Sequence, residues 1–113
     1  MQSINLTTTV NPMPIKVKKR VYHFYSDSGH GWLKVPFKDL VKLNIANKIS
    51  SYSYEKNDFI YLEEDGDLST FIIAHGNDWK DKLVIKEHHT NRRSKIRSYY
   101  SFNSWRINHV TAK

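Results

Sequence analysis

Short stretches of the chain alternate apolar and polar residues with a period of two, which is typical of half-buried strands. Residues 16–25, KVKKRVYHFY, alternate in part and are rich in β-branched and aromatic side chains. The polar residues 26–31 include two glycines and interrupt this run, and a short apolar run follows over residues 32–35. Because glycine permits the backbone conformations of tight turns, these three segments predict a β-hairpin.

A helical pattern replaces the alternation after Pro36, a residue suited to the first position of a helix. The apolar residues that follow keep one helical face apolar: Phe37, Leu40, Val41 and Leu43. Asn44 is suited to the left-handed conformation that ends many helices, and Ile45 to the hydrophobic contact that accompanies such an end. The sequence therefore predicts a short helix that stops at this point.

A second hairpin and a second helix are predicted further along the chain. Residues 49–54, in which Ile49, Tyr52 and Tyr54 are interspersed with serines, and the apolar and aromatic residues 59–62 flank the polar residues 55–58. This pattern favours two strands joined by a turn. Asp67 is a good N-cap for the amphipathic stretch after it, which the sequence Gly-Asn at 76–77 ends. Residues 79–85 then predict another strand.

Together these segments predict an α+β fold: a small, mainly antiparallel sheet of four to six short strands in hairpins, with two short helices. We expect residues 1–15 to form a flexible leader, residues 16–87 a core domain, and residues 88–113 a basic, aromatic C-terminal arm or edge strand. An exposed edge strand in this tail could pair with a second copy, so we also consider a homodimer. No apolar stretch is long enough to span a membrane, and the first residues lack the pattern of an export signal.

The positive charge of the chain is concentrated at its two ends. The net charge is +7. Residues 1–20 carry four basic residues and no acid, and residues 88–113 carry six basic residues and no acid, whereas residues 63–87 hold seven acids against three lysines. Basic ends around a mixed body are typical of proteins that contact nucleic acid or an acidic protein surface.

The C-terminal segment alternates cations with flat aromatic rings, a combination that neutralises phosphates and stacks on bases. The predicted binding residues are Arg92, Arg93, Lys95, Arg97, Tyr99, Tyr100, Trp105 and Arg106 in the tail, with Lys18, Lys19 and Arg20 near the start. No helix with a basic face is apparent, so we expect single-stranded or unpaired nucleic acid rather than a duplex. The other interpretation is that the aromatic residues pack on the sheet and the arginines are solvated at its edge.

An acidic turn offers a second candidate site. It comprises Glu63, Glu64, Asp65 and Asp67. Its spacing fits no calcium-binding loop, so a solvated turn that caps a helix is favoured over a metal site. The same acids could dock on a basic protein surface. A metal-dependent nuclease, which would rest on these acids alone, ranks last among the functions considered.

Two further groups invite a catalytic or metal-binding interpretation that their spacing does not support. Asp27, Ser28 and His30 lie in one turn, where three neighbours cannot easily make the hydrogen bonds of a catalytic triad, so we expect His30 to be exposed. Of the six histidines, only His88 and His89 are adjacent, and neighbours in a strand point to opposite faces. We predict no catalytic residues, no metal and no cofactor.

Four motifs together resemble a family of short, uncharacterised proteins of bacteriophages, prophages and plasmids. They are GHGWLKVP at 29–36, KISSYSY at 48–54, YLEEDGD at 61–67 and HTNRRSKIRSY at 89–99. The resemblance covers about residues 22–100 and implies a mobile-DNA setting in a bacterial cytoplasm, without an assigned activity.

These observations lead to two main hypotheses. The first is a non-enzymatic, phage-type accessory protein whose basic, aromatic segments bind nucleic acid or a complex that contains it. The second is an inhibitor of host defence, of the anti-CRISPR kind, that occupies the surface of a defence protein.

Overall fold

A computed structural model describes residues 18–103 of the chain. The predicted leader and the predicted binding residues Trp105 and Arg106 lie outside the described residues.

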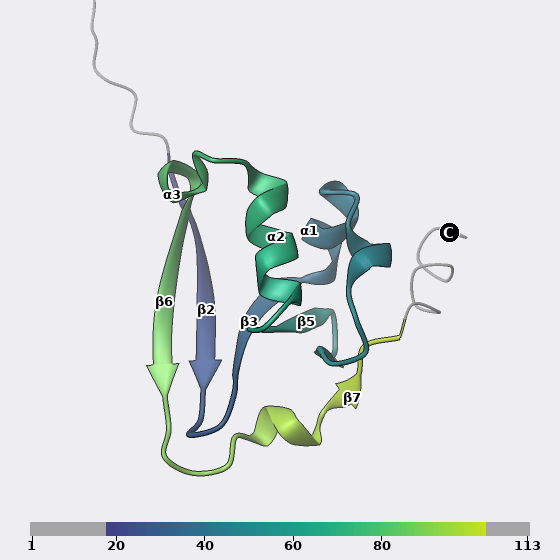
Figure 1. Cartoon of the computed structure of the whole chain (residues 1–113), viewed down its shortest axis with the longest axis vertical. Helices are drawn as coiled ribbons and strands as arrows, with labels where there is room; N and C mark the ends of the chain where they lie inside the picture. The colour runs from purple at the N-terminus through teal and green to yellow at the C-terminus, as the bar shows by residue number, and fades with distance from the viewer. Residues whose placement is uncertain (1–17, 104–113) are drawn as a thin grey trace, which may run out of the picture.

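The described residues form one six-stranded sheet with the strand order β6-β2-β3-β5-β4-β7. The strands are β2 (Arg20–Ser26), β3 (Gly31–Pro36), β4 (Tyr54–Lys56), β5 (Phe59–Glu63), β6 (Leu83–His89) and β7 (Tyr100–Ser101). Every neighbouring pair is antiparallel except β2 and β6, which run side by side in the same direction (Figure 1). The predicted α+β fold with a small, mainly antiparallel sheet is confirmed.

Short helices and helical turns connect these strands. They are α1 (Phe37–Lys42), the 3-10 turn η1 (Ala46–Lys48), α2 (Asp67–His75), α3 (Trp79–Lys82) and the 3-10 turn η2 (Lys95–Ser98). The described residues thus hold three α-helices where the sequence predicted two. The extra one occupies the first half of the strand predicted over 79–85. A parallel strand needs a crossover rather than a hairpin, and α2 and α3 supply the crossover that brings β6 beside β2.

The end of α1 follows the predicted pattern closely. Asn44 adopts a positive φ of 59°. Its N–H donates to the carbonyl of Val41 over 3.0 Å, and the N–H of Ile45 donates to the carbonyl of Leu40, also over 3.0 Å. These two bonds form a Schellman motif, and Ile45 and Leu40 are both buried in the main core.

The two predicted hairpins are present, but the second is tighter than expected. In the first, the N–H of Asp27 donates to the carbonyl of His30 over 2.9 Å between β2 and β3. In the second, β4 begins at Tyr54 rather than at residue 49, and the turn contains only Asn57 and Asp58. Asn57 has a φ of 57°, a conformation that Asn tolerates better than most residues.

The main core covers one face of the sheet and packs it against α1, η1 and α2. Leu33 of β3, Ile60 of β5 and Phe71 of α2 are fully buried there. Phe102, which follows β7, also belongs to this core. Residues 88–103 therefore begin as the end of β6, pass through η2 and finish at the far edge of the sheet (Figure 1). None of the described helices could cross a membrane.

Candidate functional site

The face of the sheet opposite the main core carries aromatic and basic side chains. Strand alternation places these residues there: His23 and Tyr25 of β2, Trp32 and Lys34 of β3, Tyr54 and Lys56 of β4, Phe59 and Tyr61 of β5, and Lys86 and His88 of β6. Within the described residues, η2 is the helical element that packs on this face, where Ile96 forms a small second core with Trp32 and Tyr61.

An ion pair holds η2 across this face. Asp27, buried in the first hairpin loop, accepts hydrogen bonds from Arg97 Nε at 2.7 Å and Arg97 Nη2 at 2.9 Å. It also accepts one from the N–H of Ser94 at 2.9 Å. The hydrogen bond from Arg97 contributes most to holding the pKa of Asp27 well below its ordinary value, and the bond from Ser94 adds to it. The same bond to Asp27 raises the pKa of Arg97. The guanidinium lies 5.5 Å from the ring centroid of Trp32, so the contact also covers the indole.

On one side of η2 lies a basic hollow of about 610 Å³. Its cations are Lys34, Lys56, Arg92, Arg93 and Lys95, and its rings are Tyr25, Tyr61, Tyr99, His88 and His89. No carboxylate of residues 18–103 lines it. Among the described residues, none of the five cations forms an ion pair. The basic hollow is therefore a concentrated, uncompensated positive surface.

The rings of the basic hollow form two groups. Tyr25 stacks on His88 at 4.9 Å between centroids, and His88 Nε2 lies 2.8 Å from His23 Nδ1, a hydrogen-bonding distance. Tyr61 and Tyr99 lie 5.1 Å apart, and Lys56 Nζ is 4.8 Å from the centroid of Tyr99. The hollow thus places a cation directly over one of its rings and brings four of its rings together in two pairs.

Tyr61 is the deepest of these rings, at 7% exposed. Burial, with the neighbouring hydroxyls of Tyr99 and Tyr25, raises the pKa of Tyr61 to about 12. Its hydroxyl is therefore protonated at neutral pH, and this protonation makes it a poor nucleophile.

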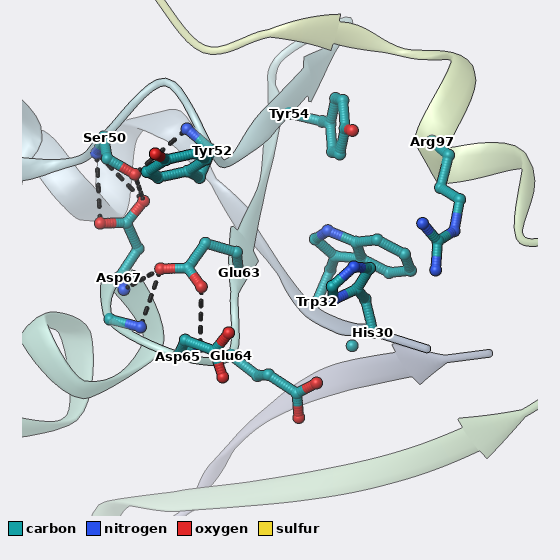
Figure 2. A pocket seen from close by; sticks show the side chains of 12 residues that line it. His30, Trp32, Ser50, Tyr52, Tyr54, Glu63, Glu64, Asp65, Asp67 and Arg97 are labelled. Carbon is teal, nitrogen blue, oxygen red and sulfur yellow. Dashed lines mark hydrogen bonds between the residues drawn. The ribbon is translucent and has the colours of Figure 1, made fainter. Parts of the chain in front are cut away.

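On the other side of η2 lies an acidic hollow of about 690 Å³ (Figure 2). Its rings are Trp32, Tyr52, Tyr54 and His30, and its charged groups are Glu63, Glu64, Asp65, Asp67 and Arg97. η2 contributes Lys95 and Ile96 to the basic hollow and Arg97 to the acidic hollow. One short turn therefore separates two sites of opposite charge.

The acids of this hollow form a turn that caps α2, as the sequence favoured, but the role of Asp67 differs from the prediction. Asp67 is not the N-cap of α2, a position that Gly66 takes, but its first residue. Its buried carboxylate accepts hydrogen bonds from the hydroxyls of Ser50 at 2.7 Å and Ser53 at 2.6 Å. These bonds fix residues 49–53 as a loop and explain why the predicted strand there is wrong over most of its length.

Glu63 performs the capping that was expected of Asp67. Its carboxylate accepts hydrogen bonds from the N–H groups of Asp65, Gly66 and Asp67 at 2.7–2.8 Å. It thereby satisfies donors at the start of α2 and places its negative charge at the positive end of the helix. Glu64 and Asp65 are left exposed.

The structure brings together only part of the predicted basic site. Arg92, Arg93, Lys95 and Tyr99 line the basic hollow. Arg97 does not, because Asp27 holds it on the other side of η2.

The remaining predicted residues that are described lie elsewhere. Arg20 Nη2 pairs with Asp39 Oδ2 at 2.9 Å, and Lys18 and Lys19 are exposed ahead of β2. Tyr100 is 83% exposed and stands opposite Glu55, so it alternates to the side of the sheet away from Tyr54.

Sequence reasoning missed six of the ten cations and rings of the basic hollow. The missed residues are Tyr25, Lys34, Lys56, Tyr61, His88 and His89. For all of them except His89, the signal was present in the period-two alternation of the strands, which places every second residue on one face. That signal identifies a shared face only after the strand order is known.

The described residues offer little for metal or triad chemistry. They contain no group of three His, Cys, Asp or Glu side chains that could hold a metal ion. His30 is exposed, as predicted. The Asp27 carboxylate is bonded to Arg97 and to the N–H groups of Gly29, His30 and Ser94, and not to an imidazole.

No family model, curated protein or solved structure matches this chain. The resemblance to short proteins of bacteriophages and plasmids stays a prediction.

Proposed function

We propose that the protein is a non-enzymatic, phage-type accessory protein that binds single-stranded or unpaired nucleic acid through the basic hollow. The observation that carries this proposal is a hollow lined by five cations and three tyrosines, where the part of the chain that the structure describes supplies no carboxylate to the lining and no ion-pair partner to the cations. Lysine and arginine displace counterions from phosphates, and the rings offer stacking surfaces to bases. The mobile-element setting and the bacterial cytoplasm rest on the sequence resemblance alone.

The shape of the site favours a single strand over a duplex. Tyr25 and Tyr99 are partly exposed and His88 is exposed, so splayed bases can stack on these rings, as on other sheet-based single-strand binders. Among the described helices, α2 is the longest at nine residues and carries no Lys or Arg. A helix of this kind cannot read a major groove in the way that recognition helices do.

The experiment is fluorescence anisotropy of labelled single-stranded DNA, single-stranded RNA and duplex DNA across a salt series. We expect single strands to bind more tightly than the duplex, with an affinity that falls steeply as salt rises. The variant Arg92→Ala/Arg93→Ala/Lys95→Ala leaves the Arg97–Asp27 pair intact and removes three cations of the hollow. We expect about a tenfold or greater loss of affinity and a shallower salt dependence.

The matched control is Lys38→Ala/Lys42→Ala/Lys48→Ala, which removes the same charge from α1 and η1 on the opposite side of the sheet. We expect this control to lose far less affinity. Equal losses in the two triple variants would mean that net charge alone is responsible and would contradict a site in the hollow. Absence of binding at near-physiological salt would contradict the proposal as a whole. It would favour the alternative of an anti-defence inhibitor that occupies a protein surface.

A further inference from the structure

The acidic hollow has walls that are fixed before any ligand arrives. Glu63 ties down the turn that enters α2, and Asp67 ties Ser50 and Ser53 to the start of that helix. On the opposite side, Asp27 holds Arg97 over Trp32. Because these groups are committed to internal bonds, a ligand would meet a preorganised surface rather than order a loose one.

Two acids and one ring of this hollow have no such commitment within the described residues. Glu64 and Asp65 are exposed and form no ion pair there. Tyr52 is 80% exposed, although its backbone N–H is fixed by Ser50 Oγ at 3.2 Å. Figure 2 shows Glu64 and Asp65 along one rim, with Tyr52, Tyr54 and Trp32 across the hollow. An exposed ring on a fixed backbone is typical of residues that anchor protein contacts.

The charge of the hollow selects a cation. Among the described residues that line it, Arg97 is the one basic side chain apart from His30, and Asp27 compensates the charge of Arg97 through two hydrogen bonds. The carboxylates of Glu64 and Asp65 therefore set the negative charge that the hollow presents to a ligand. Ammonium and guanidinium groups are attracted both to carboxylates and to the faces of aromatic rings, whereas a phosphate is repelled.

We propose that the acidic hollow binds a lysine or arginine side chain from a basic segment of a partner protein. The side chain enters between Tyr52 and Tyr54, and its charged end meets Glu64 and Asp65 at the rim. A protein is favoured over a small amine because the hollow is open and Tyr52 stands out beside it, where the backbone of a partner can pack. This surface is separate from the basic hollow, so one molecule can hold nucleic acid and a basic protein together.

The test uses the full chain labelled with nitrogen-15 and a synthetic hexapeptide, Gly-Arg-Gly-Lys-Arg-Gly, followed by NMR. We expect the amide signals of Tyr54, Glu64, Asp65 and Gly66 to shift with peptide concentration, while those of Arg92 and Arg93 stay in place. The variant Glu64→Gln/Asp65→Asn is expected to weaken binding roughly tenfold, since it removes both charged acceptors. Tyr52→Ala is expected to weaken it severalfold.

The matched control is Asp81→Asn/Glu87→Gln, which removes the same charge from exposed positions on α3 and β6. This control should keep the affinity of the parent protein. Equal weakening in both double variants, or shifts confined to other surfaces, would overturn the proposal. Spermine that binds as tightly as the peptide would also overturn it, because the occupant would then be a small polyamine. Self-association that Glu64→Gln/Asp65→Asn abolishes in sedimentation velocity would instead assign the hollow to a second copy.

Discussion

The basic hollow and the acidic hollow lie on the same sheet face, on either side of η2, yet they are built in different ways. In the basic hollow, the five cations form no ion pair within the described residues, so their positive charge is available to interact with a ligand. In the acidic hollow, the carboxylates of Glu63 and Asp67 accept hydrogen bonds from the protein itself. Within the described residues, those of Glu64 and Asp65 are exposed and form no ion pair. Counting charged residues therefore overstates the charge that a ligand meets in the acidic hollow, whereas it describes the basic hollow well. The difference arises because internal hydrogen bonds already occupy two of the acids.

Asp27→Ala is expected to have the largest effect, because Asp27 holds η2 between the two hollows. The substitution leaves Arg97 and three backbone N–H groups without their acceptor. We expect a melting temperature several degrees lower and loss of both oligonucleotide and basic-peptide binding, measured by thermal denaturation and anisotropy. Loss of only one ligand would show that η2 does not support both sites.

The same bond predicts how stability depends on pH. The pKa of Asp27 in the folded protein lies below its unfolded value of about 3.9, so its stabilisation is present above that pH. It is lost progressively as the pH falls further, towards the folded pKa. The difference in melting temperature between the parent protein and Asp27→Ala should therefore be full at pH 7 and shrink below about pH 4.

Asp67→Ala is expected to affect one hollow and not the other, because Asp67 fixes a wall of the acidic hollow and does not line the basic hollow. The hydroxyls of Ser50 and Ser53 lose a buried charged acceptor, so we expect the free energy of unfolding to fall by about 3 kcal/mol. Basic-peptide binding should be lost, while oligonucleotide binding by the folded protein is kept. Asp65→Ala is the control for stability, since an exposed acid should change it by less than about 0.5 kcal/mol. Urea denaturation measures both.

Lys34→Glu/Lys56→Glu tests the part of the basic hollow that comes from the strands rather than from the tail. Reversing two charges beside Tyr61 and Tyr99 should weaken oligonucleotide binding about tenfold or more, and leave basic-peptide binding unchanged. Lys38→Glu/Lys42→Glu makes the same charge change on α1. If that pair weakened oligonucleotide binding as much as the strand pair, the two strand lysines would not be part of a local site.

Tyr100→Ser is expected to change least. Tyr100 belongs to neither hollow and is 83% exposed, so oligonucleotide affinity, peptide affinity and stability should stay within about 0.5 kcal/mol of the parent values. Anisotropy and urea denaturation measure these quantities. A clear loss of oligonucleotide affinity would extend the nucleic-acid site to β7, as the sequence alone suggested.

Local features were predicted well wherever the cause lies within a few residues. The end of α1 at Asn44 follows from the tolerance of Asn for positive φ. The turn at residues 27–30 is also local, because the Asp27 carboxylate accepts hydrogen bonds from the N–H groups of Gly29 and His30. The strand predicted over 79–85 failed at Trp79–Lys82, because the need for a crossover to a parallel strand is not a local property. The cap assigned to Asp67 failed because Ser50 and Ser53 lie far from it in the sequence.

The sequence by itself determined the α+β class, the concentration of basic and aromatic residues near residues 92–99, the end of the first helix at Asn44 and the position of the turn in the first hairpin. These are consequences of composition and of patterns that repeat over two to four positions. Only the tertiary structure decided that Lys34, Lys56 and Tyr25 line the same hollow as Arg92 and Arg93. It also decided that Arg97 forms an ion pair with Asp27 and so does not line that hollow. The physical reason is that strand pairing and buried ion pairs join residues distant in sequence, and no local pattern encodes which strand lies beside which.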